Sequence, residues 1–351
     1  MKKKLYFLSQ FKGNQGSGVG DYCALLSANL NNKKFISTEI LSWGSTKPNW
    51  SKILEPKVKG EIISIHFVPY SFGRWGLFLE FFVELYKFRK QWNIHIMFHE
   101  IWIGDFVGAS IKDKIIGKIQ KFLVIKMIHK IKPFDIHTTN ISYLKLLKKA
   151  GIHANYLPMF GTIPIFNSSN ESFSIKKQKN TVKVVLFGCC HMNWPWDFAI
   201  DQLCNFKAFT KNDIEIHAIG KLGKNWQTIK KQFLLRLSLP IFESGFLPFD
   251  ELSLKLHDMD LSIISTPLNI IGKSSSAATL LEHGIPAIAH NNENASNSKN
   301  WIPKYYKNQI YLLENYPFED FIKNGIPLKN SPRSGLEDTA KIFMESIKDY
   351  L

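Results

Sequence analysis

Residues 270–289, IIGKSSSAATLLEHGIPAIA, read as a loop, a helix, a tight turn and a strand. The loop carries Gly272, Lys273 and Ser274, and Gly284 suits the left-handed position just past the end of the helix. A helix N-terminus has unpaired backbone N–H groups and partial positive charge. Together with the lysine, it predicts a binding site for a diphosphate. The alternative is a capped surface helix with a solvated lysine.

Short apolar runs alternate with helical patterns on both sides of this stretch. The first half predicts strands at 4–9, 35–41, 62–67, 94–99 and 136–138, and helices at 21–30, 76–92, 111–131 and 141–150. The second half predicts strands at 182–187, 214–219, 241–244, 261–265, 287–289 and 309–312, and helices at 197–209, 226–237, 250–259, 275–282 and 317–324. This alternation is typical of α/β proteins with doubly wound parallel sheets.

The length of 351 residues exceeds what one ordinary core organises, so two domains are expected. We predict a Rossmann-like N-terminal domain at 1–165 and a second such domain at 166–335. The polar segment 167–172 is the expected linker. The last residues, 336–351, predict a C-terminal helix, and one option is that it packs back on the N-terminal domain.

The composition is 45% hydrophobic and 21% charged, which excludes a disordered chain. No apolar run reaches the ~20 residues that span a bilayer. The apolar run after Lys2-Lys3-Lys4 is too short for a signal peptide and predicts a first strand. The four cysteines lack paired metal-site spacing, which predicts reduced core thiols in a cytoplasmic protein; they are Cys23, Cys189, Cys190 and Cys204.

The formal net charge is +16, and basic residues cluster in one region. Lysines alternate with apolar residues from Lys112 to Lys132, and aromatic and basic residues mix just upstream, from Arg74 to Trp92. A basic, aromatic surface suits an anionic membrane, so we expect peripheral contact with the inner membrane face through Arg74–Lys132. The alternative is that the apolar side packs on a sheet and the lysines are only solvated. Nucleic acid is not expected, because no binding motif accompanies the charge.

Glycines, a histidine and a lysine follow the predicted strands. Ligands of parallel α/β sheets bind at the carboxyl ends of strands, so these residues are candidates for a site. Gly18 and Gly20 follow the first strand, His99-Glu100 ends another, and Gly188 and Gly220-Lys221 follow two strands of the second half.

The order of these motifs resembles the GT-B glycosyltransferases, in particular the retaining family four. The stretch 16–22, GSGVGDY, resembles the glycine-rich loop that opens those enzymes. The stretches 66–76, HFVPYSFGRWG, and 97–100, MFHE, resemble segments of one bacterial branch, as do 271–274 and 283–286 around the predicted helix. The resemblance implies two Rossmann-like domains facing across a cleft and transfer of a sugar from a nucleotide-sugar.

One departure from that family concerns its pair of glutamates. The corresponding positions here are Ile271 and Thr279, and neither is acidic. Glu282 lies one helical turn beyond Thr279, so it is a candidate to take over the contact with the donor. The alternative is that Glu282 is simply exposed.

The expected roles follow from the chemistry of the leaving diphosphate, which fixed cations and helix-end N–H groups stabilise. Lys273 and Lys221 are the expected cations, and the resemblance implies that His99 contacts the donor sugar. Expected donor-binding residues are Gly18, Gly20, Gly188, Gly220, Gly272, Ser274, Ser275 and Glu282. Expected acceptor-binding residues are Tyr22, Tyr70 and Glu100. No cluster of metal-ligand type occurs in the sequence, so neither metal nor cofactor is expected.

We therefore predict a retaining, metal-independent hexosyl- or other glycosyltransferase of polysaccharide biosynthesis. It would act on a hydroxyl of a glycan or lipid-linked glycan. One alternative is a nucleotide-sugar epimerase on the same fold, which needs acid and base residues for proton abstraction. Another is a non-catalytic, membrane-associated GT-B shell, which the missing glutamates favour. The glycine spacing does not fit a Rossmann oxidoreductase.

Overall fold

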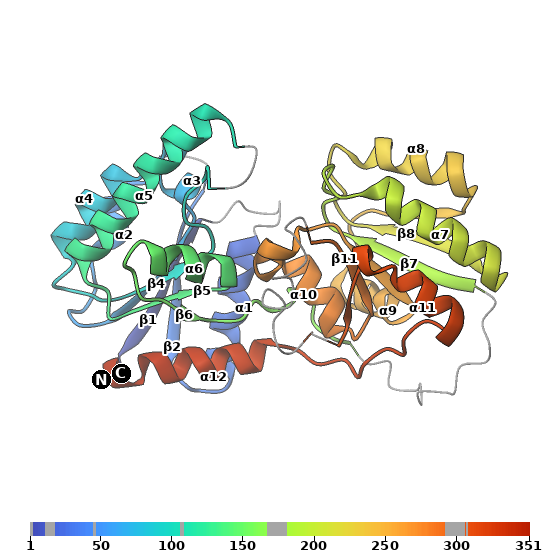
Figure 1. Ribbon diagram of the computed structural model, residues 1–351. Coiled ribbons are helices and arrows are strands. Elements are labelled where there is room, and N and C mark those ends of the chain that lie inside the picture. The colour runs from blue at the N-terminus through green and yellow to red at the C-terminus, as the bar shows by residue number, and fades with distance from the viewer. Residues whose placement is uncertain are drawn as a thin grey trace. The chain divides into compact units, whose positions relative to one another are not determined.

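The computed structural model describes residues 3–10, 18–44, 47–105, 109–166, 181–291, 306 and 308–351. The chain forms two compact units (Figure 1). The first comprises Met1–Pro158 and Leu336–Leu351, and the second comprises Met159–Gly335. The segment 167–172, expected to be the linker, lies outside the described residues.

The first unit is built on a parallel sheet of six strands in the order β2-β1-β3-β4-β5-β6. Its strands are β1 (Lys4–Gln10), β2 (Ser37–Trp43), β3 (Ile62–Phe67), β4 (Asn93–Phe98), β5 (Asp135–Thr138) and β6 (Asn155–Tyr156). Its helices are α1 (Gly18–Asn32), α2 (Trp50–Leu54), α3 (Pro69–Phe72), α4 (Leu79–Phe88), α5 (Ile111–Ile131), α6 (Ile141–Lys149) and α12 (Leu336–Ile347). It also contains the 3-10 turns η2 (Arg74–Gly76) and η7 (Lys348–Tyr350).

The two faces of this sheet differ in polarity, because successive side chains of a strand point to opposite faces. Ile63 and Ile65 of β3 join the apolar core that α2, α4 and α5 cover. Ser64 and His66 point to the other face, where Tyr22 of α1 and Phe343 of α12 pack. In Figure 1, α12 accordingly lies on the side of the sheet opposite α4 and α5.

The second unit has its own parallel sheet of six strands, in the order β12-β11-β10-β7-β8-β9. Its strands are β7 (Thr181–Phe187), β8 (Asp213–Ile219), β9 (Ile241–Ser244), β10 (Leu261–Ile264), β11 (Ala287–Ala289) and β12 (Ile310–Leu312). The chain winds outward from β7 to β9 and then returns to β10 on the other side of β7. This reversal is a topological switch point, where ligands of such sheets bind.

Helices cover both faces of the second sheet. Phe206, Phe233 and Phe318, from α7 (Trp196–Thr210), α8 (Trp226–Leu237) and α11 (Pro317–Asn324), share one apolar cluster. Leu256 and Leu280, from α9 (Phe249–His257) and α10 (Ser275–Glu282), belong to the cluster on the other face. The unit also contains the 3-10 segments η3 (Leu268–Lys273) and η6 (Leu313–Asn315).

Most predicted elements are confirmed, and the structure corrects several details. The helix predicted at 76–92 is shorter, because the backbone kinks at Trp75 and Gly76, both with positive φ, and α4 begins at Leu79. The residues before α10, predicted as a loop, form η3. The short helices α2 and α3 were missed. Of the four predicted core thiols, Cys189 is exposed and Cys204 only partly buried.

The helix α5 buries one stripe and exposes another. Leu123, Val124 and Met127 pack in the core, as one interpretation of the sequence required. Ile111 and Phe122 nevertheless expose 78% and 60% of their surface beside exposed lysines. No helix in the described part of the chain is long and apolar enough to cross a membrane.

Candidate active site

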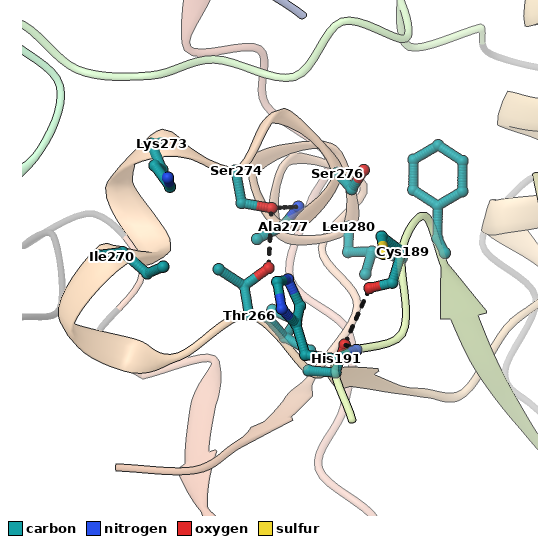
Figure 2. Close-up of a pocket in the computed structure, with 12 residues that line it drawn as sticks. Cys189, His191, Thr266, Ile270, Lys273, Ser274, Ser276, Ala277 and Leu280 are labelled. Carbon is teal, nitrogen blue, oxygen red and sulfur yellow. Dashed lines mark hydrogen bonds between the residues drawn. The ribbon is translucent and has the colours of Figure 1, made fainter. Parts of the chain in front are cut away.

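A cavity of about 250 Å³ opens at the switch point of the second sheet (Figure 2). Phe187, at the end of β7, and Ile264, at the end of β10, line it. The loops after these strands contribute Cys189, His191, Ser265 and Thr266, and the segment η3–α10 contributes Ile270, Lys273, Ser274, Ser276, Ala277 and Leu280. The predicted diphosphate site is therefore part of a cavity.

Ser265, directly after β10, forms hydrogen bonds with the loop that follows β7. Its hydroxyl donates to the carbonyl of Cys189 at 3.0 Å and accepts the backbone N–H of His191 at 3.1 Å. Gly188, between β7 and this loop, has a φ of +82°, which favours glycine. A Cβ atom there would lie 2.5 Å from Oγ of Ser276. The absence of a side chain thus lets α10 approach the end of β7.

Ser274 caps the helix α10. Its Oγ accepts the backbone N–H of Ala277 at 3.2 Å and the hydroxyl of Thr266 at 3.3 Å (Figure 2). Residue 274 has extended backbone angles, as an N-cap requires. The first turn of α10 and Lys273 therefore border the same cavity, and this brings partial positive charge from the helix next to a cationic side chain.

The charge of the cavity is one-sided. Of the twelve residues that line the cavity, one is a lysine, Lys273, and none is Asp or Glu. Burial, and then the charge of Lys273, lower the pKa of His191, so this imidazole is neutral at pH 7. The lining can accept an anion without repulsion from a carboxylate, and it offers Lys273 and hydroxyl groups as donors.

The other donor-binding candidates of the second unit lie around the cavity or apart from it. Gly272 and Ser275 flank Lys273 and Ser274 in the chain but do not line the cavity. Gly220 follows β8 with a φ of +79°, and Lys221 beside it is exposed and also outside the lining.

Glu282 lies at the opposite end of α10 from Ser274. Its carboxylate accepts the backbone N–H of Gly161 at 2.8 Å and that of Gly335. Only 2% of the residue is exposed, so the interpretation of Glu282 as an exposed residue is wrong. Burial raises its pKa to about 7. Its contacts fasten two distant backbone segments, and it is not among the lining residues of the cavity.

His99 of the first unit follows β4 and is buried, with 3% exposed. Its Nε2 lies 2.9 Å from Nδ1 of His66, while its Nδ1 is buried without a hydrogen-bond partner. Burial lowers the pKa of His99 to about 3. Tyr22 packs edge-on against His99, with ring centroids 5.1 Å apart. The structure thus brings together two of the candidate residues that the sequence places far apart.

The remaining candidates of the first unit lie at the surface or at helix ends. Glu100 is partly exposed directly after His99, and Tyr70 is half-exposed in α3. Gly18 and Gly20 belong to the first turn of α1 and not to a loop. The start of the predicted glycine-rich loop, Gly16 and Ser17, lies outside the described residues.

Sequence reasoning missed several cavity residues. His191, Ser265 and Thr266 follow strands β7 and β10, and this position was the available signal. It could not identify them because strand order decides which strand ends are neighbours. Among the described residues, no group of three or more His, Cys, Asp and Glu is placed to hold a metal ion.

Comparison with known proteins identifies the fold. No protein-family model matches this chain, and no curated protein matches it. The solved structures that resemble it include a candidate UDP-N-acetylglucosamine 2-epimerase from Listeria monocytogenes, with 10% identity, a TM-score of 0.58, and coverage of 100% of this chain and 97% of that one.

Two further solved structures align with this protein over almost the full length of both chains. The UDP-GlcNAc 2-epimerase from Methanocaldococcus jannaschii has 9% identity, a TM-score of 0.54, and coverage of 99% of this chain and 100% of that one. A glycosyltransferase from Rickettsia africae has 11% identity, a TM-score of 0.53, and coverage of 99% and 93%. With its two parallel, helix-flanked sheets of six strands, the chain has the two-domain, Rossmann-like GT-B fold that the sequence predicted.

Proposed function

We propose that this protein is a glycosyltransferase that moves a sugar from a nucleotide-sugar to a hydroxyl of a glycan or lipid-linked glycan. The observation that carries the proposal is the cavity at the β7/β10 switch point. There Lys273 and the first turn of α10 border a space of about 250 Å³, and no carboxylate is among the lining residues. These are the features that a nucleoside diphosphate requires of its site.

The chemistry asks the site to stabilise the diphosphate as it leaves and the sugar becomes cation-like. Lys273 and the N–H groups of the first turn of α10 are held by the fold, so they need little reorganisation when charge develops. The cap of Ser274 and the contact of Thr266 keep this turn in place. Lys221 is proposed as a second cation, and His99 as a contact of the donor sugar. Retention of configuration and independence of metals belong to the same proposal.

An epimerase is the second candidate function, because two of the fold relatives named above are described as UDP-GlcNAc 2-epimerases or candidates for that activity. Such a reaction needs an acid and a base at the sugar. The lining of the cavity offers neutral His191 and no carboxylate, which favours transfer. Incubation of a nucleotide-sugar without acceptor separates the two: inversion at a sugar carbon, seen by NMR, would establish the epimerase.

The first experiment is a thermal-shift panel of nucleoside diphosphates and nucleotide-sugars. A ligand that binds only the folded state raises the melting temperature by mass action. We expect a shift with one nucleotide, and we expect Lys273→Ala to reduce the affinity about 10- to 100-fold, the loss of a charge-assisted contact. Lys224→Ala, an exposed lysine near Lys221, is the matched control.

Either of two results would overturn the assignment. One is a panel without any shift, and the other is an equal shift in Lys273→Ala and the wild type. Lys221→Ala tests the second proposed cation in the same assay.

We further propose that the α5 face contacts anionic lipid at the inner membrane surface. This face comprises the exposed residues Ile111, Ile115, Ile119, Phe122, Lys112, Lys114 and Lys118. Large apolar side chains there stand beside lysines, which suits insertion at a headgroup boundary with cations above it. A lipid-linked acceptor would be presented at such a surface.

Vesicle sedimentation tests the α5 face. We expect binding to phosphatidylglycerol vesicles, much weaker binding to phosphatidylcholine vesicles, and loss of binding in Ile115→Ser/Phe122→Ser. The control is Leu235→Ser on α8, since that leucine is 83% exposed. Equal binding of both variants would contradict a role for the α5 face.

A further inference from the structure

Four buried histidines and a serine form a continuous hydrogen-bonded chain across the first sheet. The links run from His99 Nε2 to His66 Nδ1 (2.9 Å), from His66 Nε2 to Ser64 Oγ (3.2 Å) and from Ser64 Oγ to His95 Nδ1 (2.8 Å). The last link joins His95 Nε2 to His137 Nδ1 (2.9 Å). The chain therefore connects the residue after β4 to the middle of β5.

The sheet register places these side chains on one face. Ser64 is paired with His95, and His66 with Met97, which is paired in turn with His137. Paired residues of neighbouring strands point to the same face, as do residues two apart on one strand. Every member is at most 3% exposed, so water is excluded from the links.

The number of hydrogens in this chain limits its possible states. Burial lowers the pKa of His66, His95, His99 and His137, so each ring is neutral and carries one N–H. With the serine hydroxyl, five hydrogens serve four links. One hydrogen is left over, and it can lie only on His99 Nδ1, on His137 Nε2 or on a Ser64 hydroxyl turned away from the chain.

Asp135 decides between these positions. Its Oδ2 lies 3.6 Å from Nδ1 of His137, while its Oδ1 accepts from the N–H of Ile136 at 2.8 Å and from Asn155 at 3.0 Å. A carboxylate beside Nδ1 favours the tautomer with a proton there. His137 then donates to His95, and the state with the extra hydrogen on His137 Nε2 is disfavoured.

The state with the serine hydroxyl turned away is also disfavoured. It would leave both that buried hydroxyl and the lone pair of His99 Nδ1 without partners, and each unpaired buried polar atom is costly. Donation in one direction, from His137 through His95, Ser64 and His66 to His99, leaves a single unpaired group at this end, the N–H at Nδ1 of His99.

We propose that Asp135, acting through His137, His95, Ser64 and His66, is the positioning residue that holds His99 in the tautomer with a proton on Nδ1. The Nδ1–H of His99 is then a buried hydrogen-bond donor that lacks an acceptor, and an oxygen atom of a ligand can supply one. That this oxygen belongs to a sugar or phosphate group of the donor rests on the proposed function. The tautomer itself does not.

Nitrogen-15 NMR of the free protein tests the tautomer directly, because the two ring nitrogens of a neutral histidine resonate differently with and without a proton. We expect the proton of His99 on Nδ1 in the wild type. Asp135→Asn keeps the size of the side chain and removes its charge, so we expect the ratio of Nδ1–H to Nε2–H at His99 to fall several-fold. Glu215→Gln is the matched control, because Glu215 pairs with His217 of the second unit at 3.0 Å.

Ser64→Ala breaks the chain in its middle. In that background, Asp135→Asn should leave His99 unchanged, because no hydrogen-bonded path joins them. A wild-type proton on Nε2, or an unchanged ratio in Asp135→Asn, would overturn the proposal; so would an effect that persists in Ser64→Ala. If Ser64→Ala does not fold, the single variant Asp135→Asn decides. These results need no substrate, so they stand whether or not glycosyl transfer is found.

Discussion

The two sheets share a strand count and a parallel arrangement, yet they place their polar side chains differently. One face of the first sheet carries a chain of neutral histidines that satisfy one another inside the unit. In the second unit, the face of the sheet that α9 and α10 cover carries an apolar cluster. Its polar groups lie instead at the strand ends, around the cavity. The same architecture therefore supports either an internal polar network or an open polar edge, and side-chain polarity on one sheet face decides which.

The strongest test of this difference between the two sheets is the acid sensitivity of the first unit. The pKa of His66, His95, His99 and His137 is lowered in the folded state, so stability is lost as pH falls below the unfolded value of about 6.5. Because the folded pKa of His99 is about 3, protonation of this residue alone lowers the free energy of unfolding by about 3 kcal/mol between pH 6.5 and pH 4.

Hydrogen exchange resolved by peptide at pH 7 and pH 4.5 measures this loss. We expect β3, β4 and β5 to lose protection before β7 and β8. The second unit also holds a buried histidine, His283, whose pKa burial lowers to about 4. Its loss begins at the same unfolded pKa of about 6.5 and ends near pH 4, so this single group contributes a smaller total loss than the four histidines of the first unit. Simultaneous loss in both units would show that the histidine chain does not make the first unit the more acid-sensitive one.

Glu282 gives the second unit a pH dependence of the opposite sign. Its folded pKa of about 7 lies above the unfolded value, so the stability that it contributes is present below about pH 4.5 and lost as pH rises through 7. The expected loss is about 3 kcal/mol. Glu282→Gln removes the ionisation, so melting temperatures of variant and wild type should converge or cross between pH 5 and 8. A constant difference over that range would show that Glu282 does not titrate there.

Gly188→Ala compares the cavity with a turn of the first unit. Gly188 and Gly151 both have positive φ, of +82° and +75°, so alanine at either site should cost about 1–3 kcal/mol. A Cβ at residue 188 would also meet Ser276, whereas nothing lies within 4 Å of one at residue 151. Calorimetric titration should therefore find weaker nucleotide binding only in Gly188→Ala, and equal binding would argue against a nucleotide between β7 and α10.

The smallest effect concerns helix caps. Ser274 caps α10 in the second unit and Ser110 caps α5 in the first, each through its hydroxyl. Alanine at either position should cost about 1 kcal/mol of unfolding free energy. Denaturant titration measures this loss, and the thermal-shift panel should show a weakened nucleotide response in Ser274→Ala alone. A weakened response in Ser110→Ala would point to a general stability effect.

Local sequence patterns were enough to predict most helices and strands of this protein. The helices 111–131, 226–237, 275–282 and 317–324 have the predicted limits, because caps, apolar period and helix-ending residues act within a few positions of the chain. The alternation of strands and helices determined the fold class, and Gly284 has the predicted positive φ. The resemblance of several motifs in order then pointed to the GT-B fold.

The neighbouring strand ends and the contacts between polar side chains follow instead from how the whole chain packs. His191 and Thr266 are 75 positions apart in the chain, and strand order alone brings them into one cavity. The histidines of the first sheet likewise come from three strands, and only register places them on one face. The burial of Glu282 and its contacts with Gly161 and Gly335 follow from packing. Such contacts depend on long-range chain geometry, which local sequence patterns do not encode.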